Sequence, residues 1–177
     1  MSENQNISDT IVVTGATGFI GSHTCKALKR AGYKVIGIDR KVTIEPSLYF
    51  MDDFVPRDFV DCADIIAKYD NVIHIAGTSL VGPSLIDPYE YYDNNTAKTN
   101  KLLHDLSERG WKGNIIFSSS AAVYGQPHFA ITERTERKPI SPYGFSKLWC
   151  EQTIADYCRS FKMKGLSLRY FNACGAD

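Results

Sequence analysis

The stretch Ile11-Val-Val-Thr-Gly-Ala-Thr-Gly-Phe-Ile-Gly21 decides the fold of this 177-residue chain. A run of apolar residues meets glycines at positions 15, 18 and 21, and the sequence then takes on a helical pattern. Glycine permits a tight turn and lets backbone N–H groups approach a pyrophosphate, which then lies at the positive end of the helix. The stretch therefore predicts a strand, a phosphate-binding loop and a helix that begins near Phe19.

A second apolar run, Lys34-Val-Ile-Gly-Ile-Asp39, indicates another buried strand that ends in a carboxylate. The glycine spacing G-x-x-G-x-x-G is a variant of the dinucleotide-binding pattern G-x-G-x-x-G, in which an acidic residue about 20 positions further on binds the adenosine ribose. Asp39 stands at that place and favours NAD. Arg40 follows it directly and offers a partner for the 2′-phosphate of NADP, which is therefore disfavoured without being excluded.

Apolar runs bounded by turn residues alternate with helical patterns along the whole chain, which is typical of a doubly wound parallel α/β sheet with helices on both faces. The pattern predicts six strands, centred on residues 11–13, 35–38, 48–50, 72–75, 115–117 and 166–170. It predicts helices over residues 19–30, 59–68, 88–109 and 142–161, and a long loop over residues 125–140 at the carboxyl edge of the sheet, where such folds bind ligands.

Composition limits the classes of partner. The chain is 44% hydrophobic and 23% charged, which suits one α/β core, and we expect a single domain over residues 1–177. The formal net charge is zero and the charges are dispersed, so we expect neither a nucleic acid nor a membrane as partner. No apolar run approaches the roughly 18 residues needed to span a bilayer.

The five cysteines, at positions 25, 62, 150, 158 and 174, form no C-x-x-C pair and no Cys/His spacing typical of a metal site. We therefore predict no bound metal. An odd number of cysteines without a secretory signal indicates free thiols in the reducing cytoplasm.

The segment Tyr143-Gly-Phe-Ser-Lys147 places a phenol and an ammonium four residues apart on a predicted helix, where they share a face. A fixed cation favours the phenolate and lowers the phenol pKa from about 10. Tyr143 is therefore a candidate general acid/base. Ser141 is placed to cap this helix, and Pro142 suits its first turn.

Other polar groups follow neighbouring predicted strands. Ser120 closes a run of three serines and is placed to hydrogen-bond a substrate oxygen, although a serine-rich turn is the simpler interpretation of that run. We interpret His74 as a buried, hydrogen-bonded histidine and not as a base. One of Asn94 and Asn95 is expected to fix backbone or cofactor groups, with polar surface as the alternative.

Six motifs, in this order, resemble the extended short-chain dehydrogenase/reductase family and its NAD-dependent epimerase/dehydratase members, which have a Rossmann-type fold. They are Thr14-Gly-Ala-Thr-Gly-Phe-Ile-Gly21, His74-Ile-Ala-Gly77, Tyr91-Tyr-Asp-Asn-Asn95, Phe117-Ser-Ser-Ser-Ala-Ala-Val-Tyr-Gly125, Ser141-Pro-Tyr-Gly-Phe-Ser-Lys-Leu148 and Leu168-Arg-Tyr-Phe-Asn172.

The resemblance implies a set of site residues. It implies Ser120, Tyr143 and Lys147 as the catalytic residues, and Ser120, Tyr143 and Asn172 as the residues that bind substrate. It implies NAD as the cofactor, bound by Gly15, Thr17, Gly18, Phe19, Ile20, Gly21, Asp39, Asp53, Phe54, Ile75, Ala76, Gly77, Asn94, Ser118, Tyr143, Lys147 and Tyr170.

The same resemblance implies a reaction and an assembly. The reaction is epimerisation at C4 of a UDP-sugar, UDP-glucose or UDP-galactose, through a transient 4-ketose. The assembly is a homodimer through the two long helices, residues 88–109 and 142–161.

The chain also departs from the family pattern. Ser79 stands where the family usually places a lysine, and the segment between Asp39 and Asp53 is short. Family members continue for a comparable length beyond the position of Asp177 with a substrate-binding domain, so we expect that domain to be absent here and the activity of residues 1–177 to be impaired. The resemblance also disfavours a dehydratase, because dehydratases of the family carry a Thr-Asp-Glu arrangement where this chain has Ser120-Ala-Ala122. A dehydrogenase or reductase of another substrate that uses NAD or NADP, and a non-catalytic NAD-binding fragment, remain alternatives.

Overall fold

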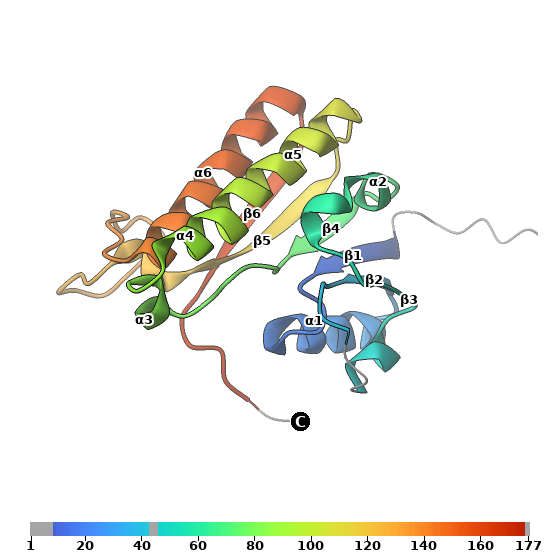
Figure 1. Cartoon of the computed structure of the whole chain (residues 1–177), viewed down its shortest axis with the longest axis horizontal. Coiled ribbons are helices and arrows are strands. Elements are labelled where there is room, and N and C mark those ends of the chain that lie inside the picture. Colours follow the sequence, from blue (N-terminus) through green and yellow to red (C-terminus); the bar gives the residue numbers. More distant parts are fainter. Residues whose placement is uncertain (1–8, 43–45, 176–177) are drawn as a thin grey trace, which may run out of the picture.

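The computed structural model describes residues 9–42 and 46–175, and within them six parallel strands form one sheet in the order β3-β2-β1-β4-β5-β6 (Figure 1). The strand order reverses between β1 and β4, which lie side by side in the middle of the sheet. From β1 the sheet continues to β2 and β3, and from β4 it continues in the opposite direction to β5 and β6. The strands are β1 (Thr10–Thr14), β2 (Lys34–Ile38), β3 (Asp53–Val55), β4 (Asn71–His74), β5 (Asn114–Ser120) and β6 (Lys164–Tyr170).

Helices cover both faces of the sheet, which confirms the doubly wound α/β prediction. Figure 1 shows α1 (Phe19–Arg30) on one side of the strands and both α5 (Lys98–Glu108) and α6 (Pro142–Phe161) on the other. Alternate side chains of β1 separate the two cores: Val13 packs in the cluster that contains Cys25 of α1, whereas Val12 packs in the larger cluster beneath α5 and α6.

The predicted helix over residues 88–109 is present as three consecutive segments. It begins with α4 (Pro88–Tyr91), continues through η4 (Tyr92–Ala97), which is a π-helix, and ends with α5. The Asp87 carboxylate accepts a hydrogen bond from the Glu90 N–H and so caps its start. The π-helical turn is not signalled by the sequence, and such turns are frequent at functional sites.

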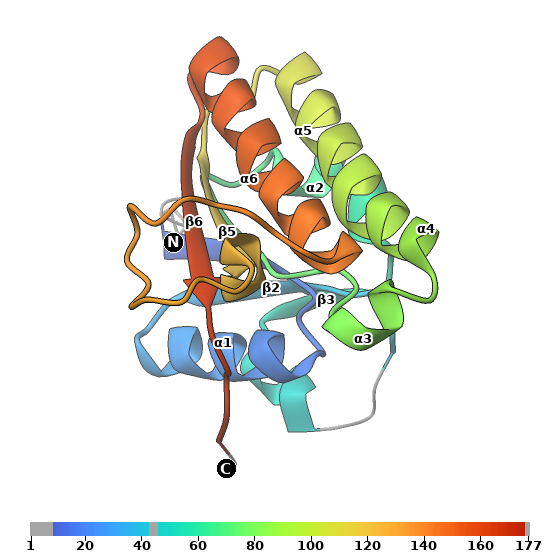
Figure 2. The ribbon, with the colours of Figure 1, turned by 90° about the vertical axis from the view of Figure 1, so that its left-hand side faces the viewer.

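The start of α6 agrees with the sequence signals. The Ser141 hydroxyl accepts a hydrogen bond from the Gly144 N–H at 3.1 Å, and Pro142 occupies the first turn, where its missing N–H leaves no hydrogen bond unmade. Figure 2 shows α5 and α6 side by side along the same face of the sheet. The cap therefore fixes where α6 begins, and with it the positions of Tyr143 and Lys147 relative to the strand ends.

The prediction of a strand at residues 48–50 is wrong. Residues Pro46–Phe50 form a 3-10 helix, η2, and the third strand is β3, where Asp53 pairs with Ile36 of β2. Tyr49 is 85% exposed while Phe50 packs on the α1 side of the sheet, so this short apolar run covers the sheet and does not extend it. Periodicity alone does not separate these two uses of a short apolar run.

Two further differences concern short helices. The predicted helix over residues 59–68 is divided into a 3-10 turn, η3 (Phe59–Asp61), and α2 (Ala63–Ile66). The short helix α3 (Val81–Ser84) was not predicted. No helix in the described ranges combines the length and the apolar character that crossing a bilayer requires.

Candidate active site

A pocket of about 920 Å³ opens at the carboxyl edge of the sheet, where the strand order reverses. Doubly wound sheets bind ligands at this point because the loops from neighbouring strands diverge there. The lining comes from the ends of all six strands or the segments that follow them, from α4 and η4, and from the start of α6. The volume lies at the upper end of the range of small-molecule and cofactor sites.

The glycine loop after β1 lines the pocket. Gly15 has a φ of +71°, in the left-handed region that side chains rarely adopt, and its N–H donates to the Ile38 carbonyl. A Cβ on Gly21 would collide with the backbone carbonyl of Gly15. Glycine at both positions therefore lets the first turn of α1 lie directly against the loop and directs the positive end of that helix toward the pocket.

Asp39 lies on the pocket wall at the end of β2. Its carboxylate accepts hydrogen bonds from the Thr17 N–H at 3.1 Å and from the Lys41 N–H at 3.0 Å. These bonds tie the loop after β2 to the glycine loop and hold the carboxylate in the pocket lining. Arg40 and Lys41 line the same end of the pocket, so cations and an anion lie together there.

Lys147 lines the pocket where it contacts β5, three places along the sheet from β2, and is only 5% exposed. Its Nζ donates a hydrogen bond to the Ser118 carbonyl at 2.9 Å and lies 6.0 Å from the centre of the Tyr143 ring. Burial lowers the pKa of the Lys147 ammonium, because the charged form is poorly solvated there. The helix thus holds a phenol and a buried cation on one wall of the pocket, as their spacing predicts.

The serines at the end of β5 have different partners. Ser120 Oγ accepts a hydrogen bond from the Ala122 N–H at 3.2 Å and caps the short helix η5 (Ala121–Tyr124). A hydroxyl that accepts a hydrogen bond still has its own O–H to donate, so Ser120 keeps a donor for a ligand oxygen. Ser118, Ser119 and Ser120 all line the pocket.

The two asparagines of η4, Asn94 and Asn95, have different roles: one fixes backbone groups and the other lines the pocket. Asn95 is 2% exposed, and its amide accepts from the Thr78 N–H at 2.7 Å and donates to the Thr78 carbonyl at 3.0 Å. It therefore fixes the backbone that follows β4. Asn94 lines the pocket, where its side chain donates to the Thr78 hydroxyl and accepts from Lys98.

His74 is the buried, hydrogen-bonded histidine that the sequence predicts. It is 0% exposed, and its two ring nitrogens lie 2.7 Å from the Thr14 hydroxyl and 3.0 Å from the Thr99 hydroxyl. Burial, together with the charge of Lys147, lowers the pKa of His74 to about 3. The ring is therefore neutral at physiological pH and acts in the structure as a hydrogen-bonding link between β1 and α5.

The structure brings nearly all of the predicted site residues into this one pocket. Asp53 and Phe54 are the two described members of the predicted set that do not line it, because both belong to β3 itself and not to the loop after it. The lining residues of that set are Gly15, Thr17, Gly18, Phe19, Ile20, Gly21, Asp39, Ile75, Ala76, Gly77, Asn94, Ser118, Ser120, Tyr143, Lys147, Tyr170 and Asn172.

Sequence reasoning missed Asp58 and Phe59, which line the pocket just after β3. With the third strand placed at residues 48–50, Asp53 would follow its carboxyl end. The observed β3 moves that edge of the sheet to the residues after Val55. Asp58 there forms an ion pair with Lys98 at 2.8 Å, and correct placement of the strand would have indicated it.

An all-parallel, doubly wound sheet with a glycine loop and an acidic residue at its switch point defines a Rossmann-type nucleotide-binding fold. The comparison with known families agrees with this class. The chain belongs to the NAD dependent epimerase/dehydratase family, whose model matches residues 11–177.

Individual relatives make the similarity more specific. The chain is 38% identical over 175 residues to a UDP-glucose 4-epimerase of Lacticaseibacillus casei, a match that covers 94% of this chain and 52% of that protein. It is 40% identical over 179 residues to a UDP-glucose 4-epimerase of Streptococcus mutans, covering 94% of this chain and 52% of that protein. The chain thus spans about half the length of the curated relatives that it matches.

A solved structure of UDP-glucose 4-epimerase from Brucella ovis in complex with NAD superposes with a TM-score of 0.86 at 41% identity, covering 95% of this chain and 53% of that one. UDP-glucuronic acid 4-epimerase from Bacillus cereus, in complex with UDP-glucuronic acid and NAD, superposes with a TM-score of 0.79 at 33% identity, covering 91% of this chain and 56% of that one.

Proposed function

We propose that this chain binds NAD along the whole pocket and uses it to epimerise C4 of a UDP-sugar, UDP-glucose or UDP-galactose. The observation that carries the proposal is that one pocket is lined both by the glycine loop and Asp39 and by Tyr143 and Lys147. Asp39 follows β2 and Lys147 contacts β5, three places further along the sheet. The similar Brucella ovis structure holds NAD, and the similar Bacillus cereus structure holds NAD with a UDP-sugar.

The residues present fit a dinucleotide. The glycine loop and the start of α1 suit a pyrophosphate, and Asp39 suits the two hydroxyls of the adenosine ribose. Lys147 has three N–H donors and uses one on Ser118, so the others are available to the ribose of the nicotinamide half. Tyr170 also lines the pocket.

In the proposed reaction, Tyr143 takes the proton from the sugar 4-hydroxyl as C4 is oxidised, and returns it when the ketose is reduced. Bound NAD supplies the acceptor, and then the donor, of the C4 hydride. Ser120 donates a hydrogen bond to the oxygen that becomes the carbonyl, and Lys147 holds the ribose of the nicotinamide half. Because the hydride taken from C4 is returned to C4, the cycle consumes no external oxidant or reductant. Inversion requires that the ketose present its opposite face before the hydride returns.

The proposal extends to domain organisation and location. The described residues make up a single NAD-binding domain that carries the catalytic side chains. The protein resides in the cytoplasm, since its cysteines are free thiols and three of them, Cys25, Cys62 and Cys150, are buried in that form.

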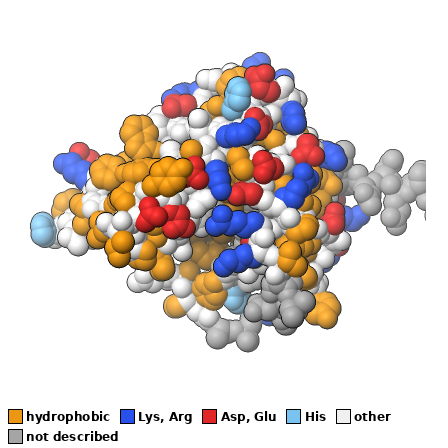
Figure 3. All heavy atoms as spheres, viewed as in Figure 1, with side chains coloured by type: hydrophobic (Ala, Val, Ile, Leu, Met, Phe, Trp, Pro, Cys, Tyr) orange, Lys and Arg blue, Asp and Glu red, His pale blue; other side chains and the backbone are white. Residues whose placement is uncertain are grey.

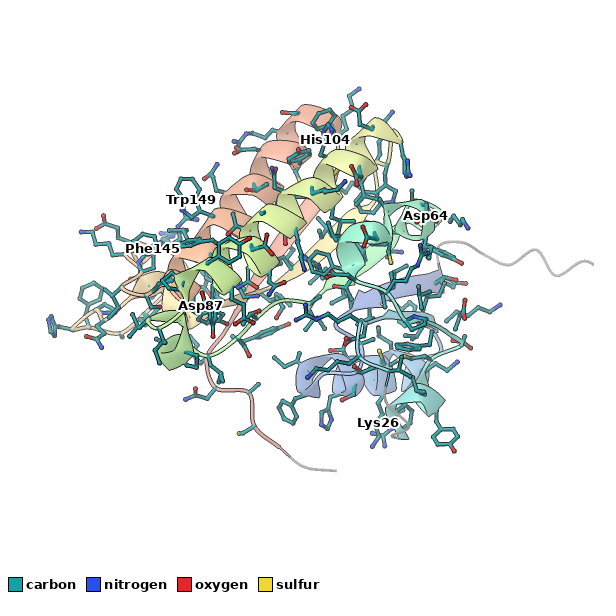
Figure 4. All side chains as sticks on the ribbon, viewed as in Figure 1. Lys26, Asp64, Asp87, His104, Phe145 and Trp149 are labelled. Carbon is teal, nitrogen blue, oxygen red and sulfur yellow. The ribbon has the colours of Figure 1, made fainter. Side chains whose placement is uncertain are left out.

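The proposal also includes a homodimer through the long helices. Figure 3 shows hydrophobic side chains gathered over the part of the molecule where α4 and α6 lie in Figure 1. Phe145 and Trp149 lie on the outer side of α6 and are 41% and 55% exposed, and Tyr89 of α4 is 76% exposed (Figure 4). Large exposed apolar groups on neighbouring helices favour a protein partner, and a second copy presents the same surface.

The experiment that tests the reaction is incubation of the purified chain with NAD and UDP-galactose, without external NADH, followed by chromatographic separation of the UDP-sugars. The proposal predicts that UDP-glucose forms. A dehydrogenase would instead require stoichiometric NAD and would release an oxidised product. Binding of NAD with no conversion of either UDP-sugar would contradict the proposed reaction.

A further inference from the structure

The carboxylate of Glu151 lies at the centre of a buried ionic cluster behind the pocket. Glu151 is 6% exposed and stands one helical turn after Lys147 on α6. Its Oε1 accepts from the Ser119 hydroxyl at 2.5 Å and from Arg169 Nε at 2.9 Å, and its Oε2 accepts from Arg169 Nη2 at 2.7 Å and from Arg137 Nη1 at 3.3 Å. Both oxygens are therefore held, and three separate segments of chain meet at one side chain.

The partners of Glu151 adjoin pocket residues in the sequence. Ser119 lines the pocket between Ser118 and Ser120, and its hydroxyl donates to Glu151 of α6. Arg169 pairs with Ser119 in the register between β5 and β6 and immediately precedes the pocket residue Tyr170. The cluster thus lies directly behind the strand ends that form the pocket wall.

Two hydrogen bonds tie consecutive residues of β5 to residues one turn apart on α6. Lys147 Nζ donates to the Ser118 carbonyl, and the Ser119 hydroxyl donates to Glu151. Two bonds of this kind fix the rotation of the helix against the strand as well as its distance. Loss of the second bond removes one of these two constraints on α6 at the strand end, and the direction of Lys147 is then less well defined.

The same cluster reaches the turn that follows Ser120. Arg169 Nη1 donates to the Tyr124 hydroxyl at 2.6 Å, and the guanidinium lies 5.0 Å from the centre of the Tyr124 ring. Tyr124 ends the short helix η5, whose Ala122 N–H donates to the Ser120 hydroxyl. The position of Ser120 therefore depends on Arg169, which depends on Glu151.

The charges in the cluster are complementary. Burial opposes ionisation of Glu151, but hydrogen bonds from Arg169 and Ser119 outweigh it and hold the pKa of the carboxyl below its usual value. The carboxylate in turn raises the pKa of the Arg169 guanidinium. Loss of the negative charge would leave a partly buried arginine without its bidentate partner, which is costly and would move the side chains around it.

We propose that Glu151 is a positioning residue of the site, which acts through Ser119 and Arg169 to set where Lys147 and Ser120 stand at the nicotinamide end of the pocket. This proposal rests on the proposed function, because it assigns that end of the pocket to the nicotinamide. It predicts that a change at Glu151 affects the nicotinamide end and leaves the adenosine end, around Gly15 and Asp39, unchanged.

The test compares the affinities of the full chain for NAD and for ADP, which contains only the adenosine half, by titration calorimetry. Glu151→Gln keeps the shape of the side chain and removes its charge. We expect NAD affinity to fall by about tenfold and ADP affinity to stay within about twofold, since precise placement of groups is what ordered sites supply. Where UDP-galactose is converted, we expect kcat to fall with KM unchanged.

Two further variants keep the test decisive. Ser119→Ala removes one hydrogen bond and no charge, so it remains informative if Glu151→Gln does not fold, and it should lower the ratio of NAD to ADP affinity in the same direction. Asp52→Asn is the matched control, because it breaks the ion pair between Asp52 and Lys29, at 2.7 Å and outside the pocket lining. It should leave the ratio unchanged.

The outcomes separate this proposal from the proposed function. If the unaltered chain binds ADP and NAD, and both Glu151→Gln and Ser119→Ala keep its ratio of affinities, the positioning role is overturned and the proposed function stands. If the variants lower both affinities equally, Glu151 is only structural, and the positioning role is likewise overturned. If the unaltered chain binds no NAD, the proposed function fails and the positioning role fails with it.

Discussion

Lys147 Nζ donates a hydrogen bond to the backbone carbonyl of Ser118 at 2.9 Å, and this contact joins the helix that carries the proposed acid/base to the strand that carries the serines. The ammonium is buried and its pKa is lowered by that burial. A structure does not need a buried ammonium at this place for stability alone, because desolvation of a charge is costly. The contact is best explained by the chemistry proposed for the pocket.

The first prediction concerns the choice between NAD and NADP. NAD that fills the pocket should stabilise the fold by about 2.7 kcal/mol at a hundredfold excess over Kd, and NADP by less, because its 2′-phosphate would lie against the Asp39 carboxylate. Thermal unfolding with each nucleotide measures the difference. Asp39→Asn should narrow it. An equal or larger shift with NADP for the unaltered chain would mean that Arg40, and not Asp39, governs this end of the pocket.

The second prediction concerns the phenol of Tyr143. Tyr143→Phe should lower the rate of UDP-galactose conversion by about 10²-fold or more, since the side chain no longer moves a proton. NAD affinity, measured by titration calorimetry, should stay within a few fold, because the phenol oxygen is not needed to hold the dinucleotide. Conversion at the unaltered rate by Tyr143→Phe would assign the proton transfer to another group.

The third prediction concerns the glycine loop. Gly21→Ala should destabilise the fold by about 1–3 kcal/mol and weaken NAD binding, because the added methyl group collides with the Gly15 carbonyl and forces the loop away from α1. Gly82→Ala is the matched control, since an added Cβ there meets no atom within 4 Å. Chemical denaturation measures both. Equal free energies of unfolding for the two variants would show that the glycine loop accommodates the added methyl group without loss of stability.

The fourth prediction concerns pH and His74. The folded pKa of about 3 lies below the value of about 6.5 expected in the unfolded chain. The neutral ring therefore stabilises the fold fully above pH 6.5, and this contribution is lost as pH falls from 6.5 toward 3, by at most about 1.4 kcal/mol per pH unit. Urea denaturation between pH 7.5 and pH 4.5 measures the slope.

His74→Gln supplies the test of that slope. The variant should show a shallower dependence of unfolding free energy on pH below 6.5, whatever its stability at pH 7.5. His104→Gln is the control, because His104 is exposed on α5 and should leave the slope unchanged (Figure 4). A slope that is the same in His74→Gln as in the unaltered chain would mean that His74 takes up its proton while folded.

The fifth prediction concerns assembly. Light scattering of the chain at micromolar concentrations should give the mass of a dimer, and Trp149→Glu on α6 should shift it to the monomer, because a charge would be buried in the apolar contact. Phe129→Glu, at a position that is 68% exposed in the loop over residues 125–140, should leave the dimer intact. A monomer mass for the unaltered chain would remove the dimer from the proposal.

The sequence predicts the fold well where the signal is local and repeated. Five of the six strands lie where apolar runs predict them, because each run is bounded by turn residues. The fifth of these, β6, is largely exposed, with Leu166 55% exposed, so an apolar run predicts a strand without predicting its burial. The strand at residues 48–50 fails because three apolar residues suit a 3-10 turn against α1 as well as a strand. Because the third strand is predicted too early in the sequence, its carboxyl end is misplaced, and Asp58 is not predicted as a site residue.

The candidate site is predictable only in part for a similar reason. Local spacing predicts the glycine loop, Asp39 and the pair of Tyr143 and Lys147, since each of these signals lies within one short stretch of sequence. The contacts of Glu151 join three elements that are distant in the sequence, and no local pattern indicates such a cluster. Its partners could be found only in the folded chain.

The most direct test of the central claim is the absorbance at 340 nm of the NAD-saturated chain after addition of UDP-galactose, with no other reductant present. Transient oxidation of the sugar at C4 predicts a rise at 340 nm that is slower with UDP-galactose deuterated at C4, and that is absent in Tyr143→Phe. If NAD is bound and the absorbance stays flat at saturating UDP-galactose, or if the rise is indifferent to deuterium and to the loss of the Tyr143 phenol, the proposed hydride transfer is contradicted.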